Sequence, residues 1–116
     1  MLQLLPLTLV MVAAVGLGLF LAWHYMRVGR RPGLNVVHLL LGAVALEQLV
    51  VMVHQGTFNE PLAFNVIIVL GIALALGLLS TVVSNRGRRT GYIVAAHAVT
   101  GLAGFAMFLV WLSSNS

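Results

Sequence analysis

The chain has 116 residues, of which 61% are hydrophobic and only 7% charged, and its formal net charge is +4. Soluble domains carry about 25% charged residues, so this composition excludes an ordinary soluble domain and indicates an integral membrane protein. The sequence contains no cysteine, which excludes disulfides, thiolate metal sites and covalent haem attachment through a CxxCH motif.

Four predominantly apolar segments follow one another, at residues 2–26, 34–54, 62–84 and 91–112. Each is close to the roughly 20 residues that an α-helix needs to cross about 30 Å of hydrocarbon. The first segment has no positive residues before it and arginines after it, the reverse of a cleaved signal peptide, so we expect it to be retained. The sequence predicts an all-α integral membrane protein with a single domain over residues 1–116, four transmembrane helices in an up-down bundle.

All cations of the chain are arginines, and they fall between the first and second segments or between the third and fourth. By the positive-inside rule these two loops are predicted to be cytoplasmic, which leaves both termini outside and suggests a multi-pass protein of a bacterial-type inner membrane. The same distribution explains the high isoelectric point without nucleic acid. Membrane lipid, in particular anionic lipid of the inner leaflet, is the expected electrostatic partner.

The first arginine loop reads GRRPG at residues 29–33 and the second reads GRRTG at residues 87–91. The loops are offset by 58 residues, whereas His38 and His97, which follow them, are offset by 59. This pattern predicts two similar helical hairpins, over about residues 1–55 and 60–113, related as parallel repeats. The alternative is that short Gly and Arg turns recur by chance in loops on one side of a membrane.

His38 and His97 are predicted to lie at matching depth, roughly 6 to 10 Å inside the membrane boundary. The second and fourth helices of an up-down bundle lie diagonally across its core, so the two imidazoles are expected to converge there. Two axial nitrogens from opposite sides are what a six-coordinate haem b iron requires, which makes His38 and His97 the candidate metal ligands. Interhelical hydrogen bonding or a proton role is the alternative.

Small residues accompany each histidine. Gly42 and Gly101 lie one turn after His38 and His97 on the same faces, and Ala45 and Gly104 continue those faces. Such residues leave room for the edge of a macrocycle, so Gly42 and Gly101 are added to the candidate cofactor site. Close helix packing without a cofactor is the alternative explanation.

Further candidate residues lie toward the arginine loops. His24 ends the first segment, and an interfacial histidine is common without a specific role. If a haem is bound, its propionates would be expected near positively charged groups at this end of the bundle. The candidates are His24, Arg30, Arg31, Arg88 and Arg89.

Glu47 is the only acidic residue within a predicted span, and it shares a helix face with His54 seven residues later. Its carboxyl group suits a proton carrier, a hydrogen bond to quinone or a contact with another protein, or simply a neutral acid bonded to a neighbouring helix. His54 has no partner histidine on the fourth segment, so a second haem is not predicted.

The segments His38 to Gly42 and His97 to Gly101, in a four-helix membrane bundle, resemble the membrane b-type cytochromes of the cytochrome b561-like kind. The resemblance implies axial ligation by His38 and His97 and electron exchange with quinone or a redox partner. The chain departs from the di-haem pattern because it lacks a second histidine pair.

The favoured interpretation is therefore a membrane electron-transfer protein that holds one haem b, as a subunit of a larger redox complex. The alternative is a non-catalytic accessory subunit of a respiratory or photosynthetic complex, holding a chlorophyll-type pigment, lipid or no cofactor. A small transporter using Glu47 ranks last, because small four-helix exporters carry their acid in the first helix. No nucleophile, base and orienting group are grouped in the sequence, so an enzyme active on its own is not expected.

Overall fold

The computed structural model of the chain describes residues 4–29, 32–55, 61–83 and 88–115, with side chains from residue 91 onward in the last of these ranges. It contains four long α-helices: α1 (Leu4–Arg27), α2 (Pro32–His54), α3 (Pro61–Val82) and α4 (Arg88–Ser114). All four are long and apolar enough to cross a membrane, which confirms the predicted fold class. The predicted start of the first span, at residue 2, and the predicted end of the third span, at residue 84, lie outside the described residues.

The helix boundaries follow from local chemistry. Pro32 and Pro61 are the first residues of α2 and α3, where the missing N–H of proline removes no helical hydrogen bond. Beyond the end of α1, Gly29 adopts a φ of 129°, which strains any residue with a side chain. The Gly29 N–H donates to the carbonyl of His24, and the His24 Nδ1–H donates to the carbonyl of Gly29 at 2.8 Å. His24 therefore closes the turn that follows α1.

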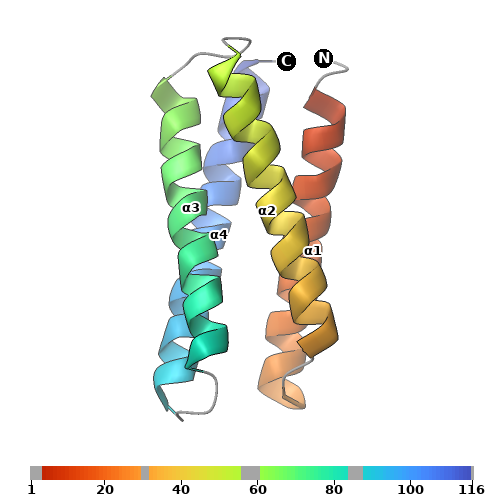
Figure 1. Cartoon of the computed structure of the whole chain (residues 1–116), viewed down its shortest axis with the longest axis vertical. Coiled ribbons are helices and arrows are strands. Elements are labelled where there is room, and N and C mark those ends of the chain that lie inside the picture. The colour runs from red at the N-terminus through yellow and green to blue at the C-terminus, as the bar shows by residue number, and fades with distance from the viewer. Residues whose placement is uncertain (1–3, 30–31, 56–60, 84–87, 116) are drawn as a thin grey trace.

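The helices run up and down, and both chain termini lie at the same end of the bundle (Figure 1). We call this the terminal end, and we call the opposite end, where α1 connects to α2 and α3 to α4, the arginine end. Helices α1 and α2 pack as one hairpin. Helices α3 and α4 pack as a second hairpin, with more extensive contact between its two helices. Helix α2 also contacts α3 and α1 contacts α4, so α2 and α4 are diagonal as predicted.

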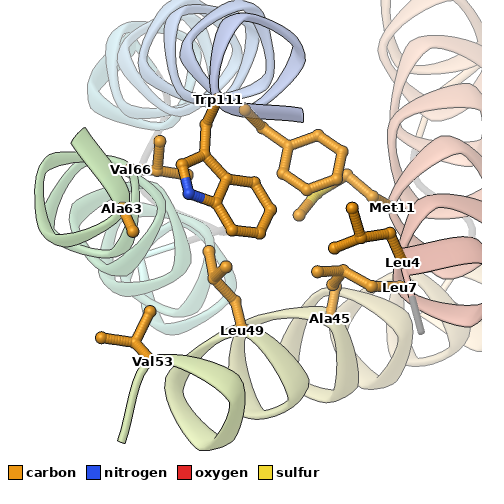
Figure 2. Packing of buried hydrophobic residues seen from close by; sticks show 10 residues of the cluster. Leu4, Leu7, Met11, Ala45, Leu49, Val53, Ala63, Val66 and Trp111 are labelled. Atoms are coloured by element: carbon orange, nitrogen blue, oxygen red, sulfur yellow. The ribbon is translucent and has the colours of Figure 1, made fainter. Parts of the chain in front are cut away.

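The bundle core is concentrated in the half nearer the terminal end. Its largest fully buried side chains are Trp111, Phe108, Leu7, Leu49 and Val66, which come from all four helices. Figure 2 shows the Trp111 indole of α4 lying between α3 and α2, with Val66 and Leu49 beside it.

The half nearer the arginine end is less closed. Every residue of α2 from 32 to 44 and of α4 from 91 to 103 keeps part of its surface accessible, whereas Ala45 and Leu49 further along α2 are buried. The two hairpins are therefore held together mainly by the apolar core of the terminal half. At the arginine end, these segments of α2 and α4 keep surface that lipid or another molecule can contact.

The two hairpins repeat each other more closely than the sequence motif indicates. Residues 33–42 and residues 92–101 have the same order of exposed and half-buried positions, residue for residue, at an offset of 59. At the same offset, the buried Leu7, Ala14 and Leu49 correspond to the buried Val66, Ala73 and Phe108. The helices thus share one register of 59 residues, and the offset of 58 is confined to the arginine loops.

We predict that the terminal-half core dominates stability. Replacing the fully buried Phe108 with alanine should lower the free energy of unfolding by about 3 kcal/mol, because it leaves a cavity where all four helices meet. The adjacent Leu109 is 44% exposed, so Leu109→Ala is the matched control and should change stability by less than about 1 kcal/mol. Both values can be measured by reversible unfolding in mixed micelles. Equal losses would contradict this assignment of the core.

Candidate functional site: the paired histidines

His38 and His97 meet across the bundle, as the sequence predicts. Their ring centroids lie 5.9 Å apart and their planes are nearly perpendicular, at 83°. One histidine comes from α2 and the other from α4, the diagonal helices. Both side chains are half-buried and lie in the less closed half of the bundle. The pair is therefore a place where side chains of the two hairpins meet.

Each imidazole rests on a glycine of the first helix in its own hairpin. A Cβ added at Gly18 of α1 would lie 2.8 Å from Cε1 of His38, and one added at Gly77 of α3 would lie 3.0 Å from Cε1 of His97. Real Cβ atoms essentially never come as close as the first of these distances. The backbone of α1 and of α3 thus forms one wall of each histidine pocket, and a side chain there would push the ring away.

Backbone carbonyl groups orient the rings. The Nδ1–H of His97 donates to the carbonyl of Ala73 on α3 at 2.6 Å, which fixes the tautomer of the neutral ring with its proton on Nδ1. In the first hairpin, the backbone of Ala14 approaches His38 without completing a hydrogen bond, so the His38 Nδ1 is buried without a partner in the described part of the chain. Ala14 and Ala73 are again 59 residues apart.

The Nε2 atoms are the free ends of both rings. Neither forms a hydrogen bond with any described residue, and neither is enclosed as the Nδ1 of His38 is. An imidazole whose Nδ1–H is held by a carbonyl and whose Nε2 is free has the arrangement of a typical metal-ligating histidine. His97 has this arrangement, whereas the Nδ1 of His38 has no hydrogen-bond partner in the described part of the chain.

The predicted small residues behave in two different ways. A Cβ added at Gly42 or at Gly101 would meet no atom within 4 Å, so there is space beside both glycines, as expected. The space expected beside Gly104 is absent, because a Cβ there would lie 2.6 Å from Cδ2 of Leu70, and Ala45 is buried. The expectation was wrong at these two positions because both lie where the bundle is closely packed. Gly104 of α4 lies against α3, and Ala45 of α2 belongs to the core of the terminal half.

The remaining candidates do not join the histidine pair in the described structure. The Nδ1 of His24 is engaged with the turn after α1, and its ring lies 5.9 Å from that of Phe20. Arg30 and Arg31, together with the side chains of Arg88 and Arg89, lie outside the described residues. His54 and Glu47 are exposed on α2, toward the terminal end.

Sequence reasoning missed Gly18, Gly77, Ala14 and Ala73 as parts of the site. The signal was present, however, because both pairs follow the 59-residue offset of His38 and His97. Extending the repeat from the histidines into the preceding helices would have found them.

Comparison of the chain with protein-family models, with curated proteins and with solved structures finds no match. The resemblance to membrane b-type cytochromes therefore stays a prediction, and any function has to be argued from the site itself.

We predict that Gly18 is needed for the position of His38. Gly18→Val should displace the ring and lower thermal stability by several degrees, since the added side chain overlaps Cε1. Gly16→Val, two residues away, is the matched control and should be tolerated, because a Cβ at Gly16 meets no atom within 4 Å. The measurement is the melting temperature in detergent together with the imidazole NMR signals of His38. Identical behaviour of the two variants would contradict the contact.

Proposed function

We propose that this protein is a membrane electron-transfer protein that binds one haem b between α2 and α4, with His38 and His97 as axial ligands. The observation that carries the proposal is the pair of half-buried imidazoles, 5.9 Å apart, on diagonal helices. When bound, the haem would supply reversible one-electron transfer.

The residues present fit this group on three counts. His38 and His97 come from different hairpins and their ring centroids lie 5.9 Å apart, so both imidazoles would be at hand to hold one iron. The Nε2 atoms are free, and the Nδ1–H of His97 is held by a carbonyl. The space beside Gly42 and Gly101 lies one helical turn from the two rings.

The protein's contribution would be to hold the ligands in place. Gly18 and Gly77 set how deeply each ring sits in its hairpin, and the carbonyl of Ala73 keeps His97 in one tautomer. The hydrogen bond to that carbonyl also makes Nε2 a stronger electron-pair donor. The apolar core of the terminal half would keep water from that side of the site. Arginines near the arginine end, with Arg30 and Arg88 the first candidates, would bind the propionates.

The proposed setting is a bacterial-type inner membrane with the arginine loops in the cytoplasm, as the positive-inside rule favours. The site would then lie nearer the cytoplasmic face. A single haem at that depth suits exchange with a redox partner or quinone on the same side, within a larger membrane complex.

The second candidate is a non-catalytic accessory subunit in which the histidines serve packing or hold a chlorophyll-type pigment. The specific observation in its favour is the direct contact of both rings with glycines, which fills the space around them from one side without any cofactor. The accessible α2 and α4 surfaces at the arginine end would then be covered by another subunit.

Spectroscopy separates the two candidates. We expect the purified protein, supplied with haem and reduced with dithionite, to show the sharp α band of a six-coordinate b haem. His38→Ala and His97→Ala should each abolish that six-coordinate spectrum, because each removes one axial ligand. His54→Ala is the matched control, since His54 is exposed at the terminal end of the same helix as His38, and its spectrum should be unchanged.

A colourless protein that takes up no haem would contradict the proposal and favour the accessory subunit. An α band that survives both single substitutions would also contradict it, because the ligands would then have to be other residues.

A further inference from the structure

The repeat also shows where the two hairpins differ. At the 59-residue offset, Glu47 and Gln48 of α2 correspond to Ala106 and Met107 of α4. The histidine site is built from features that both hairpins share, whereas this polar pair occurs in the first hairpin alone. It is therefore an addition to the repeated scaffold that the histidine site does not use.

A groove lies at these two residues on the outside of the first hairpin. It is a shallow, open groove with a volume of about 540 Å³. Pro6 and Leu7 of α1 and Val44, Val51 and Met52 of α2 form its apolar walls. Its polar lining consists of Glu47, Gln48 and Gln55.

Glu47 lies in the groove without a described cationic partner. It lies seven residues before the end of α2, roughly 10 Å along the helix from the terminal end, and its side chain is exposed on the outside of the bundle. An acidic side chain that faces hydrocarbon is costly, and such groups are normally paired. No described cationic side chain lines the groove. A positively charged molecule bound in the groove would supply such a partner.

Charge indicates the class of that partner. Glu47 is the one acidic residue in the described part of the chain, and it lies on the terminal side of His38 in α2. Among the described residues, Arg27 ends α1 and Arg88 and Arg89 begin α4, at the opposite end of the bundle. When ionised, the Glu47 carboxyl gives the groove a negative charge that no described arginine neutralises there, which favours a cation over a neutral or anionic ligand.

The shape of the groove indicates what the apolar part of the ligand is like. Glu47, Val51 and Gln55 are spaced at i, i+4 and i+8, so they form one stripe from the carboxyl group to the terminal end of α2. A polar group at each end of an aliphatic wall suits a molecule that enters from the terminal end and lays an apolar body along α1 and α2. We propose that the groove binds a lipid-soluble organic cation, with its positive charge paired to the Glu47 carboxylate. This inference goes beyond the proposed haem function and does not depend on it.

The test is saturable binding of tetraphenylphosphonium to the whole protein in nanodiscs of zwitterionic lipid, with empty nanodiscs as the background. Glu47→Gln keeps the size and hydrogen bonding of the side chain but removes its charge, so it should weaken binding by about tenfold or more. Glu47→Asp restores the charge and should recover most of the affinity. His54→Ala, on the same helix face, should bind as the unaltered protein does.

Two outcomes would overturn the proposal. The first is the absence of saturable binding to the unaltered protein. The second is equal binding by the unaltered protein and Glu47→Gln, and displacement of the probe by decylubiquinone in both would then identify a site for a neutral hydrogen-bonding head group. The reduced haem spectrum should be the same in Glu47→Gln as in the unaltered protein, so failure here is distinguishable from failure of the haem proposal.

Discussion

The imidazole rings of His38 and His97 have to be satisfied from inside the bundle, because hydrocarbon offers them no hydrogen bonds. For His97 the helices achieve this by bringing backbone close to the ring. Gly18 and Gly77 have no Cβ, so α1 and α3 approach the histidines closely enough for the carbonyl of Ala73 to accept the His97 Nδ1–H at 2.6 Å. The packing inside each hairpin, and with it the contact between the hairpins, is arranged around these two approaches.

That arrangement divides the molecule along its length. In the terminal half, large side chains such as Trp111, Phe108 and Leu49 fill the space between all four helices. In the arginine half, the shared polar pair replaces large apolar residues, and the facing segments of α2 and α4 stay partly accessible. Packing of apolar side chains thus supplies rigidity at one end, while the Nε2 atoms of the two histidines, nearer the other end, form no hydrogen bond with any described residue.

Much of this could be predicted from the sequence for simple physical reasons. Four apolar stretches of membrane-spanning length leave no alternative to helices, because a helix satisfies its own backbone in lipid. Pro32 and Pro61 mark helix starts, and the 59-residue spacing of His38 and His97 places them at one depth on parallel helices. Their meeting across the diagonal followed from up-down connectivity. The space beside Gly104 was predicted wrongly, because whether a glycine leaves room or admits a neighbour depends on Leu70, a residue 34 positions away.

The sequence by itself therefore determined the class of fold, the number and order of the helices, the internal repeat and the identity of the paired histidines, since each depends on composition and spacing along the chain. The tertiary structure alone decided which glycines contact the imidazoles, which nitrogen of His97 is held, where the core closes, and that Glu47 lines a groove on the outside of the first hairpin. These features depend on the rotation and separation of neighbouring helices. A hydrophobic pattern that is apolar on every side of the helix leaves that rotation unspecified, so only side-chain packing could fix it.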